Sequence, residues 1–117
     1  MEKVLEQIKS IVKTELLKRG FNVEVCIEQD KNGRINIETS DFQTQPVLFK
    51  NIWIRNGFMS NLEEKHNELT DTKFYEYKTK ITAYYECFGG GFNANDLFAM
   101  TFRWFNENEV VHLINII

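Results

Sequence analysis

The chain has 117 residues, of which 43% are hydrophobic, 26% charged and 14% aromatic, and its formal net charge is −3. A chain of this length forms one domain, and we take residues 1–117 as a single α+β domain. The aromatic content and the single proline exclude a mainly disordered chain, and the lack of any run of 18 apolar residues predicts no transmembrane helix.

The first predicted element is an amphipathic helix over residues 2–19. Glu2 near its start and Lys18 near its end complement the helix dipole, and Gly20 can close the helix. Apolar residues recur at every third or fourth position and therefore share one face. They are Val4, Leu5, Ile8, Ile11, Val12, Leu16 and Leu17.

A β-hairpin is predicted after this helix. Residues 21–27 alternate apolar and polar side chains, which is typical of a half-buried strand. The pair Asn32-Gly33 is a strong signal for a tight hairpin turn. Ile35 and Ile37 alternate with polar residues and so predict the return strand.

A loop, a third strand and a short second helix are expected next. Residues 40–46 are polar and predict the loop, and residues 47–55 predict the strand. Ser60 and Glu63 have the spacing of a capping box, which favours the start of a helix. One side of that helix would carry Leu62, His66 and Leu69.

Three further strands are predicted in the last part of the chain, over residues 73–88, 97–105 and 110–117. Apolar residues recur at every second position of 97–105, which favours a strand over a buried helix beginning near Asn95. The run Gly89–Gly91 predicts the connection that precedes this strand.

This order of elements predicts an α+β fold. The N-terminal helix would pack on a curved, mainly antiparallel sheet of about six strands, with the short helix as a second one. The last strand is apolar on both faces, and one helix cannot bury both. Either the sheet curls around an interior or its second face contacts another chain. The C-terminal strand pattern is loosely similar to the closing hairpins of cystatin-like and NTF2-like rolls, although residues 21–55 depart from the NTF2-like order.

The candidates for metal binding and nucleophilic catalysis are few. Cys26, Cys87, His66 and His112 are the only cysteines and histidines. Their spacing differs from the close ligand pairs of structural zinc sites, so we expect no metal and no cofactor. Nothing in the spacing requires Cys87 and His112 to meet as nucleophile and base.

The Gly89–Gly91 run invites comparison with phosphate-binding loops. Such loops bind phosphate through backbone amides when a helix begins directly after them. The chain has neither a Gly-Lys-Ser/Thr nor a G-x-G-x-x-G sequence, and the segment that follows reads as a strand. A flexible strand connection is therefore the preferred interpretation.

Charge and cysteine content bear on partners and compartment. The net charge of −3 argues against nucleic-acid binding in general. Residues 87–117 contain one arginine and no lysine, which argues against a double-stranded-RNA-binding domain. Two cysteines 61 positions apart do not form a disulfide framework, and the first twenty residues lack the apolar core of a signal peptide. We therefore expect a cytoplasmic protein without membrane association.

The preferred function is that of a non-enzymatic protein-binding domain. Its most specific version is an acidic inhibitor of a basic partner such as a nuclease-like toxin. This profile is similar to that of immunity proteins and phage anti-defence proteins. The expected contact surface is the C-terminal hairpin with its rim: Asp96, Arg103, Trp104, Glu107 and Glu109.

Two alternatives remain open. In the first, a curled sheet encloses a pocket for a small ligand or an enzyme reaction, with Tyr85, Glu86 and His112 as its polar residues. In the second, the doubly apolar hairpin joins two copies of the chain in a homodimer with a structural or adaptor role.

Overall fold

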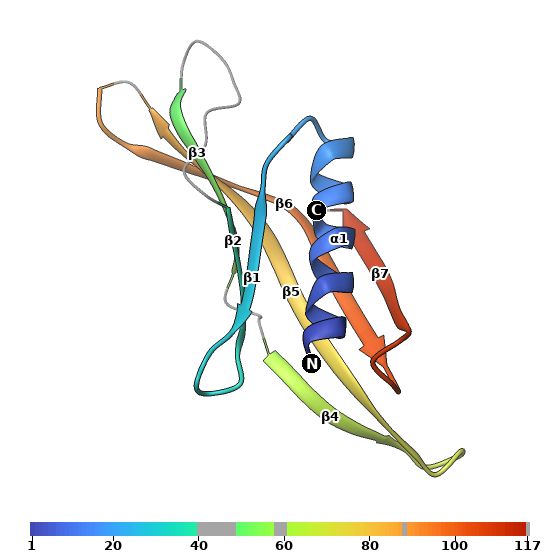
Figure 1. The fold of residues 1–117 in the computed structure, drawn as a ribbon. Helices are drawn as coiled ribbons and strands as arrows, with labels where there is room; N and C mark the ends of the chain where they lie inside the picture. Colours follow the sequence, from blue (N-terminus) through green and yellow to red (C-terminus); the bar gives the residue numbers. More distant parts are fainter. Residues whose placement is uncertain (40–48, 58–60, 88, 117) are drawn as a thin grey trace.

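The computed structural model describes residues 1–39, 49–57, 61–87 and 89–116, and for residues 49–51, 87 and 116 it describes the backbone alone. Within these ranges the chain forms one helix and a seven-stranded sheet (Figure 1). The elements are α1 (Glu2–Lys18), β1 (Val25–Gln29), β2 (Ile35–Thr39), β3 (Phe49–Asn56), β4 (Asn61–Asn67), β5 (Thr72–Cys87), β6 (Phe92–Trp104) and β7 (Val110–Ile116).

The sheet is organised around β5, a strand of 16 residues. All pairings are antiparallel, and the order is β1-β2-β3-β5-β6-β7. β6 follows one edge of β5 from Tyr75 to Glu86. Along the other edge, β4 pairs with residues 72–78 and β3 with residues 81–87, so β4 and β3 follow each other along that edge. The result is an open, elongated sheet in a molecule of 56 × 27 × 22 Å.

The helix α1 covers one face of this sheet (Figure 1). Its buried residues Val4, Ile8, Val12 and Leu16 recur every four positions, as the sequence pattern predicts. They pack in one core with buried strand residues from across the sheet, including Ile35, Ile37, Ile54, Tyr77, Ile81, Phe98, Met100 and Phe102. The α+β class and the helix-on-sheet arrangement expected from the sequence are therefore confirmed.

The first hairpin is also confirmed. β1 and β2 pair from Val25 with Thr39 to Gln29 with Ile35. Asp30 begins the turn, because its Oδ1 accepts hydrogen bonds from the backbone N–H groups of Asn32 and Arg34. Gly33 has φ +82°, a conformation that a side chain disfavours. The predicted loop over 40–46 lies outside the described residues.

The expected second helix is wrong, because residues 61–67 form the strand β4. Each of its seven residues pairs with β5, from Asn61 with Lys78 to Asn67 with Thr72. A capping box stabilises a helix start by only about 1 kcal/mol, whereas a continuous ladder satisfies the backbone along the whole segment. Ser60 itself lies outside the described residues.

The face of the sheet opposite α1 carries a different set of side chains. Tyr77, Thr79 and Ile81 belong to the core, so Glu76 and Lys78 point to the opposite face, because side chains alternate along a strand. Arg103 lies beside Glu76 in the ladder, and Val111 beside Arg103. This face is open, and the cavities described below lie on its surface. No helix of the described residues is long and apolar enough to cross a membrane.

Candidate protein-binding surface

β7 forms one end of the sheet and has a free outer edge. In the part of the chain that the structure describes, β7 pairs with β6 alone. Its sequence Val-Val-His-Leu-Ile-Asn-Ile contains no lysine, acid, proline or glycine. Natural proteins usually protect an edge strand with such residues or with a covering element. No residue of β7 itself therefore protects its outer edge, and among the described residues α1 binds only the first N–H group of the strand, that of Val110.

Two apolar side chains of β7 face solvent. Val110 and Ile114 pack against the core. Val111 and Leu113, on the opposite face, are 52% and 61% exposed. They line a shallow cavity of about 280 Å³ together with Lys78, Thr101, Arg103 and His112. This edge thus combines free backbone groups with exposed apolar surface.

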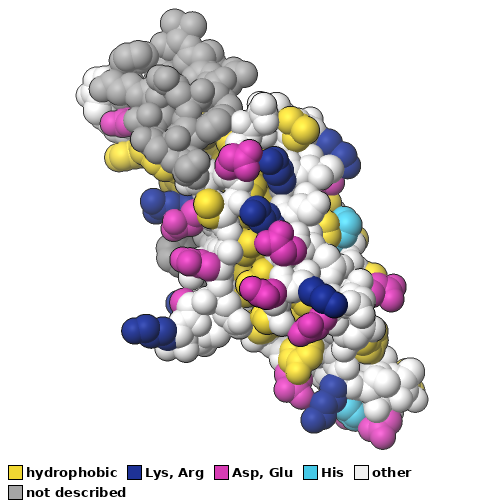
Figure 2. All heavy atoms as spheres, viewed as in Figure 1, with side chains coloured by type: hydrophobic (Ala, Val, Ile, Leu, Met, Phe, Trp, Pro, Cys, Tyr) yellow, Lys and Arg dark blue, Asp and Glu magenta, His cyan; other side chains and the backbone are white. Residues whose placement is uncertain are grey.

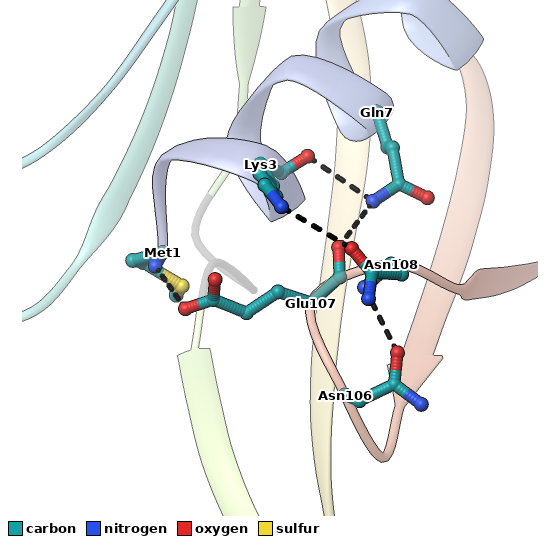
Figure 3. Close-up of polar contacts among 6 residues, drawn as sticks. All are labelled: Met1, Lys3, Gln7, Asn106, Glu107 and Asn108. Atoms are coloured by element: carbon teal, nitrogen blue, oxygen red, sulfur yellow. Dashed lines mark hydrogen bonds and ion pairs between the residues drawn. The ribbon is translucent and has the colours of Figure 1, made fainter.

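The beginning of β7 is fixed to the first turns of α1 (Figure 3). Gln7 Nε2 donates hydrogen bonds to the backbone oxygens of Glu107 (2.7 Å) and Lys3 (3.1 Å). Gln7 Oε1 accepts a hydrogen bond from the backbone N–H of Val110 at 3.2 Å. Lys3 Nζ donates to Asn108 Oδ1 at 3.4 Å. A single glutamine therefore joins the helix to both the turn and the first residue of the strand.

The end of β7 lies near the end of α1. The Arg19 guanidinium stacks over the Phe98 ring, 4.4 Å from its centroid. Phe98 is in turn the ladder partner of Ile116. The helix and the edge strand therefore run side by side in the same direction.

A buried carboxylate lies on the open face, two strands from the free edge. Glu76 is 2% exposed, and its oxygens lie 2.8 Å from Lys65 Nζ and 2.6 Å from Arg103 Nε. The ammonium of Lys65 and then the guanidinium of Arg103 lower the pKa of Glu76 to about 2, against the opposing effect of burial. This cluster links β4, β5 and β6, and its charges are used within the fold.

The predicted partner-binding residues do not form one surface. Trp104 is 4% exposed, and its ring stacks on the Tyr75 ring on the side of the sheet that faces the core. Asp96 is bound by Thr82 Oγ1 (2.9 Å) and Lys80 Nζ (3.2 Å), which lower the pKa of its carboxyl. Arg103, on the open face, binds Glu76 as described.

The two acids of the last turn differ from each other. Glu107 Oε1 lies 2.8 Å from the amino group of Met1, which lowers the pKa of the Glu107 carboxyl. Glu109 is exposed and makes no ion pair with the described residues.

Acidic and basic side chains are interspersed over the face that carries α1 (Figure 2).

Of the three polar residues proposed for a pocket, Tyr85 and Glu86 are neighbours on β5, and His112 lies far from both. Tyr85 pairs with Asn93 of β6, whereas His112 pairs with Phe102, nine positions further along the same strand. At 3.4 Å per residue this is a separation of roughly 30 Å. Tyr85 and Glu86 therefore share no cavity with His112.

The other candidates for chemistry are also separate. Cys26 is an exposed free cysteine on β1, and the side chain of Cys87 is not described. His66 lies in β4, where its Nε2 is 2.9 Å from Asp71 Oδ1. Among the described side chains, no group of three or more His, Cys, Asp or Glu could hold a metal ion.

A second cavity, of about 400 Å³, opens on the same face between the ends of β3 and β4. Arg34 and Arg55 line it and make no ion pair with other described residues. Its remaining polar lining consists of Asn36, Asn56, Asn61 and Tyr84. The cavity therefore has cationic donors and no acidic side chain in its described wall.

Sequence reasoning missed Gln7 and Glu76, and it placed the contact surface on the C-terminal hairpin and its rim without identifying the free edge of β7. Gln7 is a polar residue on a helix and carries no signal of its own. The lack of any charge between Glu109 and the chain end was the available signal for the free edge. Comparisons of the chain with protein-family models, with curated proteins and with solved structures found no match.

Proposed function

We propose that this chain is a non-enzymatic protein-binding domain that binds by adding a strand of its partner to the outer edge of β7. The observation that carries the proposal is the edge itself: seven residues without a charge, with Val111 and Leu113 exposed beside it. An added strand gains main-chain hydrogen bonds, and alternate side chains provide specificity.

The position of β7 supports such a role. Gln7 holds the first residue of β7, and the ladder with β6 orders the strand from Val110 to Ile116, so little order is lost when a partner binds. The shallow cavity beside Val111 and Leu113 offers room for a partner side chain over the stems of Lys78 and Arg103.

A narrower version of the proposal is an inhibitor of a basic protein in the cytoplasm, of the immunity or anti-defence type. Two acids of the expected rim, Asp96 and Glu107, are already bound within the molecule. Glu109 is available for a basic partner at the entrance to β7. We therefore expect the apolar edge of β7 to provide most of the binding free energy. Glu109 would mainly raise the rate of association with a basic partner.

The test compares three tagged forms of the chain in a lysate of its source organism: the wild type, Leu113→Lys and Leu69→Lys. Leu69 is 97% exposed in the β4–β5 turn, so it is a matched control for the same chemical change. A protein retained by the wild type and by Leu69→Lys, but lost with Leu113→Lys, supports the proposal. Equal retention by all three forms contradicts it.

The cavity at Arg34 and Arg55 favours a second candidate function, the binding of a small anion. Guanidinium groups that make no close ion pair bind phosphate or carboxylate groups through paired hydrogen bonds. Asp30, whose pKa Arg34 helps to lower, and Glu38, the ladder partner of Arg55, would compete with such an anion. Inorganic phosphate is the first probe. In an NMR titration at constant ionic strength, it should shift the amide signals of residues 34–36 and 55–57. Arg55→Gln should abolish these shifts, and Lys73→Gln, an exposed control on β5, should leave them unchanged.

A further inference from the structure

We infer that the strand bound at the free edge is β7 of a second copy, so that the chain forms a two-fold symmetric dimer with one continuous sheet across both molecules. This inference rests on the proposed function, because it uses the same edge of β7. It adds that the strand bound there belongs to a second copy of the chain.

The first argument is self-complementarity of the side chains. An antiparallel pairing centred on His112 places Val111 of one copy opposite Leu113 of the other, and does so twice by symmetry. Val111 and Leu113 are the exposed apolar residues of this strand, on the face opposite α1. Val110 and Ile114 are brought opposite each other in the same register, on the α1 side. Apolar cross-strand pairs of this kind stabilise antiparallel sheets.

The second argument is charge complementarity between the two ends of the α1–β7 unit. At the end where α1 begins, three carboxylates, those of Glu2, Glu6 and Glu109, make no ion pair with described residues, against the single ammonium of Lys3 that makes none. At the other end, Lys18 and Arg19 share the single carboxylate of Glu15, at 3.0 and 2.8 Å, which leaves an excess of positive charge.

The antiparallel register sets these ends against each other. Because α1 and β7 run in the same direction, reversing one β7 against the other also reverses the two helices. The acidic end of each copy then lies toward the basic end of its partner, and the opposed helix dipoles favour the same arrangement. β7 contains no lysine, arginine or acidic residue that would repel a second copy, and its one titratable side chain is His112, which faces its own copy in this register.

The primary test is sedimentation velocity over a range of concentrations for the wild type, Leu113→Lys and Leu69→Lys. We expect a concentration-dependent dimer for the wild type and for Leu69→Lys. Leu113→Lys should raise the dimer Kd by about tenfold or more, since each dimer loses two apolar pairs and gains two edge lysines. A wild type that stays monomeric, or a Leu113→Lys variant that dimerises as well as Leu69→Lys, overturns the inference.

The register is tested by cross-linking in a Cys26→Ser, Cys87→Ser background. His112→Cys should form an intermolecular disulfide under mild oxidation, because residue 112 faces itself across the two-fold axis. Asn115→Cys is the matched control on the same strand, since its two copies would lie roughly 20 Å apart at 3.4 Å per residue. Equal cross-linking at both positions overturns the register.

The two proposals fail in different ways. If the wild type is monomeric but a foreign protein is retained and is lost with Leu113→Lys, the edge binds a heterologous strand and the self-pairing is wrong. If Leu113→Lys changes neither the sedimentation nor the retained proteins, the proposed function is wrong as well.

Discussion

Arg103 Nε donates a 2.6 Å hydrogen bond to Glu76 Oε2 across the ladder between β5 and β6. The two residues are direct cross-strand partners, and Lys65 approaches the same carboxylate from β4. Glu76 is almost fully buried, whereas Arg103 and Lys65 are partly exposed. The Glu76 carboxylate therefore links three neighbouring strands, β4, β5 and β6.

Replacing this carboxylate should destabilise the fold in a pH-dependent way. Glu76→Gln keeps the size of the side chain and removes its charge, and it should lower the free energy of unfolding by about 1–3 kcal/mol at pH 7. The folded-state pKa of about 2 lies below the ordinary 4.5, so this stabilisation is present above about pH 4.5 and is lost as the pH falls toward 2. Urea unfolding at several pH values measures the difference.

The control for this experiment is Glu64→Gln, because Glu64 is 53% exposed and lies 3.5 Å from Lys73. We expect almost no change for this exposed pair. A difference between wild type and Glu76→Gln that stays constant from pH 7 to pH 2 would show that the charge of Glu76 contributes nothing.

Gln7→Ala should loosen the contact between α1 and β7. The change removes donors and an acceptor used by the backbone of Lys3, Glu107 and Val110. We expect a loss of about 1–2 kcal/mol in unfolding free energy and faster amide hydrogen exchange at residues 110–114. Gln29→Ala, which removes a single side-chain bond in the β1–β2 hairpin, should have a smaller effect and leave β7 exchange unchanged. Unaltered exchange in β7 after Gln7→Ala would contradict the prediction.

Asn56→Ala should weaken the contact between β2 and β3. Asn56 Oδ1 accepts a hydrogen bond from the backbone N–H of Ile37 at 3.1 Å. Asn56 Nδ2 donates to the backbone oxygen of Ile35 at 2.8 Å and to the hydroxyl oxygen of Tyr77 at 3.0 Å. Because these backbone groups flank buried side chains, losing their partner should cost about 2 kcal/mol or more. Thermal unfolding of Asn56→Ala and of the control Asn36→Ala, whose amide makes only a 3.5 Å contact with Asp30, checks this. A similar Tm for both variants would refute the role of Asn56.

Thr79→Val should stabilise the protein. The hydroxyl of Thr79 is buried at 2% exposure and has no hydrogen-bond partner among the described residues. Valine has nearly the same shape without the buried polar atom, so we expect a gain of about 1 kcal/mol in unfolding free energy. Thr101→Val, at a half-buried position on the open face, is the control and should be near neutral. A destabilised Thr79→Val variant would mean that the hydroxyl is satisfied in solution.

The elements with a strong local period could be predicted from the sequence. The helix over residues 2–18, the hairpin at Gly33 and the long strand before Gly89 all follow from side-chain spacing and turn residues. For the helix and for residues 97–105 the same spacing also identified the buried side, since Val4, Ile8 and Phe102 lie in the core. Residues within one helix or strand carry that information themselves.

Only the tertiary structure decided which segments meet. Ser60 and Glu63 favoured a helix locally, but β5 offers residues 61–67 a complete antiparallel partner. The separation of Tyr85 from His112, the burial of Glu76 between Lys65 and Arg103, and the position of β7 at the sheet edge all depend on strand order. Strand order joins residues far apart in the chain, so a periodic pattern within one segment cannot encode it.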